Sequence, residues 1–452
     1  MERVVIVGAG PVGVAAAILL AQRGIASLVL DRYPEPYPLP RAVHVDDEVM
    51  RILQVLGVAE EFLQVSRPGL GLRLLDARHR VMATFDRDPS RGPHAYPQAN
   101  MFDQPDLERL LRRRMAAEPL ISFVPGTVVS VDFPTVGYRL PDGTVQSVQA
   151  SAVLGCDGAN STVRDLIGAT LVDLGFEERW LVVDGICEED LRAWGGVHQV
   201  CDPRRAATFM QLGPRRYRWE FRLLPGETDL DVDPLLAPWL GTVPVRIVRR
   251  AEYTFRASVA STWQSGRVFL LGDAAHQTPP FIGQGLGAGL RDAYNLAWKL
   301  ATGDAALLAS YERERLPHVR AQIRLAIVAG WAMTGGQDRA AAVRRLLLGS
   351  VWRLPGMKGL ALRSTSPALR GVGRGRLAGT FAPQPSRGFD TVLGDGWAVL
   401  YTGAEPSGFP AEYRLVKVTD EVDPNGSLRR WMRGRQIVLR PDRVVFATRR
   451  SQ

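Results

Sequence analysis

The stretch Val4-Val-Ile-Val-Gly8-Ala-Gly10-Pro11-Val-Gly13 decides the first part of the fold. Its β-branched opening is typical of a buried parallel strand, and three glycines follow with GxGxxG spacing. The first glycine permits a tight turn, the second lets the backbone approach a pyrophosphate, and the third allows a helix to pack closely on the strand. We therefore predict a strand, a turn and a helix whose N-terminal amide groups face an anion.

A second strand is expected at 27–30, and Asp31 and Arg32 follow it. Asp31 lies 18 residues after Gly13, near the spacing at which a carboxylate accepts a hydrogen bond from a ribose hydroxyl. A glycine-rich surface turn is the alternative, but strand, helix and acid in this order favour dinucleotide binding. The pattern does not by itself separate FAD from NAD. The candidate cofactor-binding residues here are Gly8, Gly10, Pro11, Gly13, Asp31 and Arg32.

A second glycine-rich turn lies further along the chain, after the apolar run 268–271. A helical pattern from Leu290 to Leu300 follows it. Two separated glycine-rich turns favour a flavin enzyme that holds FAD at both. The second turn reads Gly272-Asp273-Ala-Ala-His276-Gln-Thr-Pro279-Pro280-Phe-Ile-Gly283-Gln-Gly285-Leu-Gly287.

Three further segments fit the same organisation. A predicted strand at 152–155 leads into Asp157-Gly158, with Arg164 shortly after. The segment Asp103-Gln104-Pro105 opens a helix with proline in its first turn. The segment 40–48, which contains Arg41 and His44, precedes a predicted helix at 49–56.

Together these motifs resemble the group A flavoprotein monooxygenases, whose fold type is that of para-hydroxybenzoate hydroxylase. Within that group the chain is most similar to the 3-(3-hydroxyphenyl)propionate hydroxylase branch, over roughly residues 1–330. The segments that carry the resemblance are Pro38-Leu-Pro-Arg-Ala-Val-His-Val-Asp-Asp-Glu48, Pro97-Gln-Ala-Asn-Met-Phe-Asp-Gln104, Gly175-Phe-Glu-Glu-Arg-Trp-Leu-Val-Val-Asp184 and Gly272-Asp-Ala-Ala-His276.

The resemblance implies an α/β fold with a Rossmann-like FAD-binding domain and an inserted antiparallel β-sheet that roofs the substrate cavity. Alternating side chains at 218–224 and 245–249, separated by turns, support the inserted sheet. A short thioredoxin-like remnant without cysteine is expected at the C-terminus, as a cap or a homodimer surface. The expected ranges are 1–67, 96–171 and 257–340 for the FAD-binding domain, 68–95 and 172–256 for the substrate domain, 341–379 for a helical linker and 380–452 for the remnant. A long helix is expected at 310–328, either kinked or divided at Pro317.

The resemblance also implies roles for individual residues. Arg41 and Gln104 would lie along the pyrophosphate and ribityl chain of FAD, and Asp157 and Gly158 near the pyrophosphate and the transient nicotinamide. Asp273 would accept a hydrogen bond from a ribityl hydroxyl. The loop 279–287 would run beside the flavin ring, and the alternating glycines of 285–289 (Gly285, Gly287 and Gly289) predict a compliant backbone there. The cofactor-binding candidates in this second turn are Gly272, Asp273, Pro280, Gly283, Gly285, Leu286 and Gly287.

The substrate candidates come from the predicted inserted sheet. Tyr217, Trp219 and Phe221 alternate along one strand and share a face opposite Glu220. That face either packs in the sheet core or lines an aromatic cavity. The same choice holds for 209–211 on the preceding strand. The substrate-contacting candidates are Phe209, Gln211, Tyr217, Trp219 and Phe281.

Three residues are candidates for direct participation in the reaction: His44, Pro280 and Trp219. His44 could orient a phenol or gate the flavin, or it could be a loop residue that caps 46–47. His276 could act as a base, but a hydrogen-bonded structural histidine beside the cofactor is the favoured interpretation.

The composition bounds the class of protein. The 452 residues suffice for two or three domains, and an apolar content of 46% is ordinary for a globular protein. The net charge of +9 comes from arginines spread along the chain without a basic-aromatic repeat, which favours a solvated surface over nucleic-acid binding. No apolar run is long enough to span a membrane and no secretory signal is present, so a cytoplasmic enzyme is expected. Three cysteines and six scattered histidines lack the spacing of metal ligands, so no metal is predicted.

The resemblance implies hydroxylation of a phenolic or other aromatic substrate with NADH or NADPH and O2, through a flavin hydroperoxide. With one dinucleotide motif only, the nicotinamide is expected to bind transiently. Two alternatives remain: a monooxygenase that epoxidises or oxygenates a polycyclic natural-product intermediate, and a flavin-binding protein without redox function. A flavin halogenase is excluded because the chain lacks the WxWxIP motif.

Overall fold

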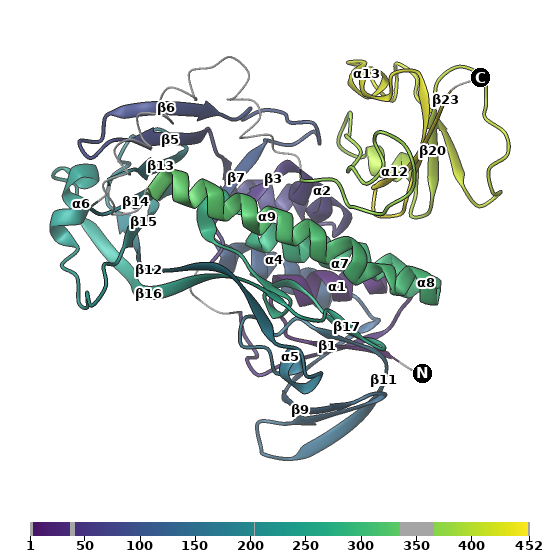
Figure 1. Ribbon diagram of the computed structural model, residues 1–452, viewed down its shortest axis with the longest axis horizontal. Coiled ribbons are helices and arrows are strands. Elements are labelled where there is room, and N and C mark those ends of the chain that lie inside the picture. The colour runs from purple at the N-terminus through teal and green to yellow at the C-terminus, as the bar shows by residue number, and fades with distance from the viewer. Residues whose placement is uncertain (1–2, 37–40, 203, 335–365, 451–452) are drawn as a thin grey trace.

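The computed structural model describes residues 3–36, 41–202, 204–334 and 366–450, and two eight-stranded sheets dominate it (Figure 1). The first sheet has the order β17-β18-β11-β1-β2-β8, with β10 and β9 attached through β11. The pairings from β18 to β8 are parallel, so the connections cross over and place helices on the faces of the sheet. Its strands are β1 (Arg3–Val7), β2 (Ser27–Asp31), β8 (Ile121–Pro125), β9 (Thr127–Asp132), β10 (Thr135–Arg139), β11 (Val145–Gly155), β17 (Gln264–Ser265) and β18 (Val268–Leu270).

Two helices that begin at the two glycine-rich turns, α1 (Pro11–Ala21) and α7 (Gly285–Thr302), pack against each other. The glycine at position 289 of α7 permits this close approach, because a Cβ there would lie only 2.6 Å from Cγ2 of Val12 in α1. The long helix α9 (Ser310–Thr334) contains Pro317 and is a single element, so the proline does not divide it. The other helices of this part are α2 (Asp47–Val55), α3 (Ala59–Val65), α4 (Gln104–Ala116), α5 (Thr162–Leu166) and α8 (Ala305–Leu308).

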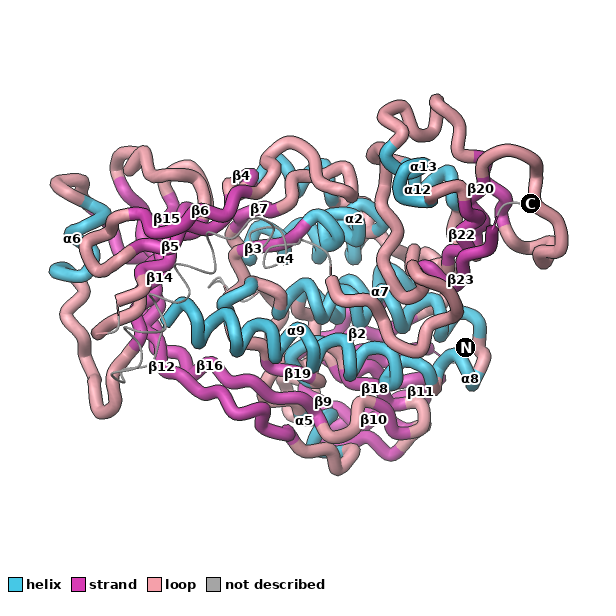
Figure 2. The backbone as a smooth tube through the Cα atoms, turned by 45° about the horizontal axis from the view of Figure 1, so that its top comes forward, coloured by secondary structure: helices cyan, strands magenta, loops and turns pink. Residues whose placement is uncertain are grey.

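The second sheet has the order β19-β16-β12-β15-β14-β13-β5-β6 and is mainly antiparallel. Its long strands β12 and β16 pair over most of their length and extend toward the first sheet (Figure 2). These two paired strands therefore bridge the space between the two sheets. The strands are β5 (Gly71–Leu75), β6 (Val81–Asp86), β12 (Leu171–Cys187), β13 (Val197–Val200), β14 (Ala207–Gln211), β15 (Arg216–Arg222), β16 (Val245–Ala260) and β19 (His276–Gln277).

One face of the second sheet carries its own hydrophobic core. Aromatic side chains of β14 and β15 pack there beneath α6 (Asp233–Leu240), together with Leu236 and Trp239 of that helix. The opposite face points toward the first sheet and bounds a cavity. A third, small sheet with the order β3-β7-β4 lies beside the cavity, formed by β3 (His44–Asp46), β7 (Ala99–Phe102) and β4 (Ser66–Pro68).

The C-terminal region forms a separate four-stranded mixed sheet with the order β21-β20-β22-β23. Together with the two short helices of the region, this sheet forms a small α/β unit, the kind of unit expected for a shortened thioredoxin-like region. The predicted helical linker at 341–379 falls largely outside the described residues, and its described part, 366–379, consists of turns and loop without a helix. The elements of the region are β20 (Ala398–Tyr401), β21 (Arg414–Lys417), β22 (Arg435–Leu439), β23 (Val445–Arg450), α12 (Phe389–Leu393) and α13 (Ser427–Met432).

Buried ion pairs join this region to the helices of the first domain, at the end of the molecule remote from α6 (Figure 1). Arg51 of α2 makes two hydrogen bonds of 2.7 Å to the carboxylate of Asp390. Arg440 pairs with Glu314 of α9 at 3.0 Å, and Glu314 also pairs with Lys299 at 2.9 Å. Since buried charges are tolerated only when paired, this contact is specific and not a loose tether.

Candidate active site

A cavity of about 790 Å³ runs from the first glycine-rich turn to the second sheet. Segments that are far apart in the sequence line it, which is typical of a site formed where two sheets meet. The structure brings together there the sequence-predicted residues Gly10, Pro11, Arg41, His44, Gln104, Gly158, Asp273, Pro280, Phe281, Gly283, Gly285 and Leu286. The predicted residues Gly8, Gly13, Asp31, Arg32, Asp157, Gly272 and Gly287 lie outside this lining.

The first turn has the geometry of an anion cradle. Gly8 has φ +104°, and a Cβ there would lie 2.4 Å from the carbonyl oxygen of Cys156. A Cβ on Gly13 would lie 2.0 Å from the Gly8 oxygen, so both positions require glycine. Around Gly10, by contrast, no atom lies within 4 Å of a Cβ position. Because α1 has no side-chain cap, its first amide groups stay available for a ligand that fills this open space.

Asp31 fixes the outer edge of this cradle. Its Oδ2 accepts a hydrogen bond of 2.6 Å from the backbone N–H of Ala9, and its Oδ1 accepts one of 2.8 Å from Tyr33. The carboxylate at the end of β2 therefore lies against the turn, where a ribose of a dinucleotide would follow. Arg32 is exposed beside it.

The side chain of Gln104 is hydrogen-bonded to a neighbouring loop and is not free to contact a ligand in the cavity. Its Oε1 accepts hydrogen bonds from the backbone N–H groups of Arg41 at 3.1 Å and Ala42 at 2.6 Å. Its Nε2 donates to Glu108 at 2.6 Å. The start of α4 thereby holds the 41–42 loop at the cavity wall.

Asp273 lies on the second turn and lines the cavity. Partial desolvation by the surrounding turn raises its pKa, although the residue keeps contact with solvent. Asp292 of α7 anchors the turn, because its carboxylate accepts a hydrogen bond of 3.0 Å from the backbone N–H of Gly272. The same carboxylate accepts a hydrogen bond of 2.8 Å from Arg315 Nε. His276 Nε2 lies 2.8 Å from the same carboxylate. Burial alone would raise the pKa of Asp292, but Arg315 and His276 hold it below the ordinary value.

This network decides between the two interpretations of His276. The imidazole is fully buried, is hydrogen-bonded to Asp292 and does not line the cavity. His276 is therefore a hydrogen-bonded structural histidine and not a base that faces the cavity. Asp157 is likewise engaged: Ser161 Oγ donates to it at 2.5 Å and Val163 N at 3.1 Å, so it caps α5 while Gly158 faces the cavity.

The segment after Asp273 is more rigid than its glycines predict. Residues Pro280–Ile282 form one turn of 3-10 helix, and Gly285–Gly289 lie in the first turn of α7. A Cβ on Gly287 would lie 3.0 Å from Val49 and one on Gly289 would lie 2.6 Å from Val12, so these two glycines allow α7 to pack closely on α2 and α1. The prediction of a compliant loop was wrong for 285–289. The N-terminus of an 18-residue helix opens on the cavity instead and favours negative charge there.

His44 lies in strand β3 and not in a loop. Its Nδ1 is 3.5 Å from the carbonyl oxygen of Gly283, and Gly283 itself has φ +61° with no room for a Cβ beside the imidazole. Burial lowers the pKa of His44, so the ring is neutral at neutral pH. It links the small sheet to the segment that precedes α7.

Of the two possibilities left open for the aromatic face, the structure shows core packing, because Phe209, Tyr217 and Trp219 belong to the core on the other face of the second sheet. Their candidacy as substrate-contacting residues is therefore wrong. Gln211 points the same way, with its Nε2 3.2 Å from the Tyr217 hydroxyl. The alternation along β15 does put Tyr217, Trp219 and Phe221 on one face, but α6 covers that face. Trp219 is therefore a core residue and not one that contacts the substrate.

Polar residues form the wall that faces the cavity. Arg218 donates two hydrogen bonds to Asp184, at 2.7 and 3.0 Å, and a third to the carbonyl of Arg41 at 3.0 Å. Arg249 approaches the same carboxylate at 3.5 Å and lies over the ring of Tyr253. Glu220 follows along β15, 3.9 Å from Arg218. Trp180, Val182, Thr208 and Met210 complete this wall.

Sequence reasoning missed Asp184, Arg218, Glu220, Arg249 and Asp292. One signal was available, since Asp184 is an acid inside the apolar run 181–184 and needs a buried partner. The partner could not be named, because Asp184 and Arg218 become neighbours only through the register of β12 against β15.

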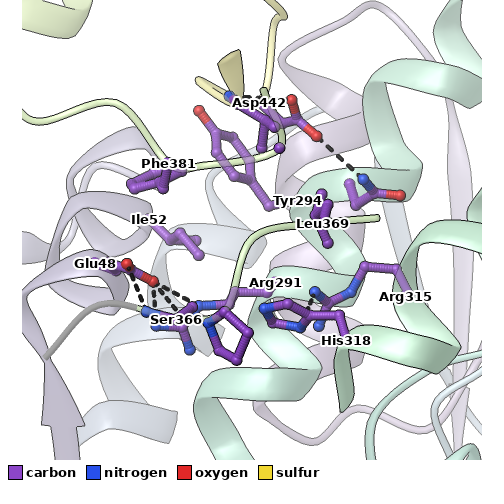
Figure 3. Close-up of a pocket in the computed structure, with 14 residues that line it drawn as sticks. Glu48, Ile52, Arg291, Tyr294, Arg315, His318, Ser366, Leu369, Phe381 and Asp442 are labelled. Atoms are coloured by element: carbon purple, nitrogen blue, oxygen red, sulfur yellow. Dashed lines mark hydrogen bonds and ion pairs between the residues drawn. The ribbon is translucent and has the colours of Figure 1, made fainter. Parts of the chain in front are cut away.

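A second, separate hollow of about 40 Å³ lies where α2, α7 and α9 meet the C-terminal region (Figure 3). Glu48 accepts hydrogen bonds there from Arg291 and from Ser366, and Arg315 lies 2.9 Å from His318. Its volume suits one or two water molecules and not a cofactor. Among the described residues no cluster of three or more histidine, cysteine, aspartate or glutamate side chains could hold a metal ion, and no helix in the described ranges is long and apolar enough to cross a membrane.

The cradle, the open position at Gly10 and the cavity-facing Asp273 fit an extended dinucleotide whose flavin end meets the N-terminus of α7. Comparison with known proteins gives the same class: the chain belongs to the FAD binding domain family, which matches residues 1–326. The predicted group of FAD-dependent monooxygenases is thereby confirmed.

Particular relatives cover almost the whole chain. A probable NADH-specific resorcinol 4-hydroxylase of Rhodococcus jostii (strain RHA1) is 36% identical over 494 residues, covering 99% of this chain and 92% of the relative. A 3-(3-hydroxy-phenyl)propionate/3-hydroxycinnamic acid hydroxylase of Burkholderia cenocepacia (strain HI2424) is 32% identical over 511 residues, with 98% and 93% covered. The crystal structure of aklavinone-11 hydroxylase with FAD and aklavinone superposes with a TM-score of 0.79 at 24% identity, covering 99% and 95%, and shows the same fold.

Proposed function

We propose that this FAD-dependent monooxygenase hydroxylates a single-ring phenol with O2 and prefers NADH as the electron donor. The single-ring substrate and the donor are supported by the resorcinol and hydroxyphenylpropionate hydroxylases among the relatives. The observation that carries the proposal is one continuous cavity that joins a dinucleotide cradle at Gly10 to a polar wall on the second sheet.

FAD, when bound, would supply the redox chemistry: two electrons from the nicotinamide reach O2, and one atom of that O2 is transferred to the ring. Gly8, Gly10 and Gly13 would admit the pyrophosphate, with Asp31 at the adenosine ribose. Gln104 would act through the 41–42 loop, whose backbone it fixes. Asp273 would accept a hydrogen bond from the ribityl chain.

The segment Pro280–Leu286 and the start of α7 would border the flavin ring, where the helix dipole stabilises negative charge. His44, neutral because burial lowers its pKa, would hold that segment through Gly283 and close one side of the ring site. Phe281 packs edge-on against Phe176 and Trp180 at 5.6 and 6.0 Å, which makes this end of the cavity apolar. An apolar surround keeps water away from the reacting oxygen.

Neither alternative is favoured. The relatives by sequence carry names of enzymes for single aromatic rings, whereas the likeness to aklavinone-11 hydroxylase extends to the fold only. The relatives' names as hydroxylases also speak against a flavin-binding protein without redox function.

We further propose that the C-terminal region, which docks through Arg51 and Arg440, caps the FAD-binding part. Its outer surface could also form the contact of a homodimer.

The test uses the purified full-length chain. We expect about one FAD per chain, and NADH consumption that resorcinol or 3-(3-hydroxyphenyl)propionate stimulates, with a product 16 mass units heavier than the substrate. NADPH in place of NADH should support a slower reaction. Consumption without hydroxylated product for both phenols would refute the proposed function.

A further inference from the structure

Glu220 is a carboxyl group on the cavity wall for which the described residues provide no hydrogen bond. It is 8% exposed and lines the cavity from β15. Its closest charged neighbour is Arg218, at 3.9 Å, which is too far for a hydrogen bond. No donor in the described part of the chain satisfies its oxygens. A buried carboxylate normally accepts several hydrogen bonds, so an acceptor this poorly satisfied is suited to a ligand donor.

The neighbouring cations are directed elsewhere. Arg218 binds Asp184 through two nitrogens and the Arg41 carbonyl through a third. Arg249 approaches Asp184 as well. Among the charged groups that act most strongly on Glu220, Arg218 and Arg249 are therefore balanced by Asp184 and Glu220 itself; Arg41, Arg87 and Arg256 line other parts of the cavity. An anionic group placed at Glu220 would meet a like charge, whereas a neutral hydroxyl can donate its hydrogen to the carboxylate.

We propose that Glu220 accepts the hydrogen of a ring hydroxyl of the substrate, takes up that proton during oxygen transfer, and so selects a neutral phenol at this position. The inference deepens the proposed function and rests on it. It assigns Glu220 as a catalytic residue, since it touches the reacting molecule, and Arg218 and Asp184 as positioning residues.

The proton and electron balance is as follows. The hydroxyl O–H bond breaks, Glu220 gains the proton, and the electron pair of that bond moves into the ring. A ring carbon ortho or para to the hydroxyl forms a bond to one atom of O2 while the O–O bond breaks, and the second oxygen leaves as water. The ring carbon then loses its hydrogen as a proton, and Glu220 returns its proton to the hydroxyl oxygen. NADH supplies the two electrons together with one hydrogen as hydride, and the solvent supplies one proton, so that these two hydrogens leave in the water. The proton lost by the ring carbon is balanced by the one on the new hydroxyl group.

The electrostatic surroundings support this role. Burial raises the pKa of Glu220 above the ordinary 4.5, Arg218 and Arg249 act to lower it, and Asp184 acts to raise it. A raised pKa makes the carboxylate a stronger proton acceptor for a phenol. Since the ionised form is required, the rate should fall as the pH drops through this raised pKa.

The experiment compares Glu220→Gln with the wild type, using resorcinol and 3-(3-hydroxyphenyl)propionate as probes. The matched control is Glu178→Gln. Glu178 lies on the neighbouring strand β12, burial also raises its pKa, and Trp180 donates to it at 2.9 Å, but it does not line the cavity. FAD content, melting temperature, kcat, KM and peroxide released are measured for each, with resorcinol affinity by calorimetry.

We expect Glu220→Gln to keep its FAD and melting temperature and to lose about 100-fold or more in kcat for resorcinol. KM should change less than kcat, and the acidic limb of the wild-type pH profile should disappear. Glu220→Asp should restore part of the rate, and Glu178→Gln should behave as the wild type. The kcat for 3-(3-hydroxyphenyl)propionate should fall as well, because its ring hydroxyl needs the same proton acceptor.

A Glu220→Gln variant with wild-type kcat and an unchanged pH profile overturns the inference and leaves the proposed function intact. Loss of activity in step with FAD content or melting temperature overturns it in favour of a structural role. If neither phenol stimulates NADH oxidation by the wild-type enzyme, the proposed function itself is contradicted.

Discussion

Replacing Gly10 by alanine should separate cofactor binding from folding. The residue lies at the N-cap of α1 with φ −71° and ψ 177°, a conformation open to any residue, and a Cβ would meet no atom within 4 Å. The stability of the apoprotein should therefore stay the same or rise by about 0.4–1 kcal/mol, because alanine restricts the unfolded chain. The methyl group would occupy the space through which the turn approaches the pyrophosphate.

Loss of one charge-assisted hydrogen bond in that space costs about 1.5–3 kcal/mol, so FAD should bind roughly 10- to 150-fold more weakly. The contrasting variant is Gly13→Ala, whose Cβ would lie 2.0 Å from the backbone oxygen of Gly8. That clash should cost at least about 1–3 kcal/mol of stability before any cofactor is added.

The assay is urea unfolding of both apoproteins, followed by FAD titration of the folded protein. Apoprotein is required because bound FAD would itself add stability to the folded state. Wild-type FAD affinity in Gly10→Ala would refute the cradle, and so would a loss of stability equal to that of Gly13→Ala.

Three further predictions concern stability. Trp219→Ala should cost about 3–5 kcal/mol in urea unfolding, because the fully buried indole packs on Phe209, while peroxide released per NADH stays at the wild-type value; selective uncoupling at unchanged stability would return Trp219 to the cavity. Burial lowers the pKa of His94 from 6.5 to about 3 in the folded state, so the unfolded chain binds the proton first and stability is lost as the pH falls below 6.5, by about 2 kcal/mol at pH 5; His94→Gln should flatten this dependence, and an equal slope in both proteins would contradict it. Arg51→Ala leaves Arg443, at 2.9 Å, as the remaining partner of the buried Asp390 carboxylate and should cost about 1–3 kcal/mol. An unchanged melting temperature would show that the Arg51–Asp390 pair does not hold the C-terminal region.

Local patterns predicted the parts of the site that depend on neighbouring residues in the chain. The strand before Gly8, the main part of helix α1 beyond Gly13, and Asp31 at the end of β2 follow from hydrophobic periodicity and glycine spacing, although α1 begins earlier, at Pro11. The turn at Gly272–Asp273 follows in the same way. These elements bring most of the predicted cofactor residues to one cavity.

Properties that depend on tertiary packing were not accessible. A period of two shows that Tyr217, Trp219 and Phe221 share a face, but it does not show which face α6 covers. Glycine content predicted a compliant loop at 285–289, but those glycines lie in α7, where α1 packs closely. The pair Asp184–Arg218 exists because two strands adopt one register, which no local pattern encodes.

The most direct test of the central claim, monooxygenation of a phenol, is the origin of the oxygen in the product. Purified enzyme with FAD, NADH and resorcinol is allowed to react under ¹⁸O2 in ordinary water, and in parallel under ordinary O2 in H2¹⁸O. We predict one ¹⁸O atom per hydroxylated product in the first reaction and none in the second. A product that takes its oxygen from water, or NADH oxidation that yields only peroxide, would contradict the account.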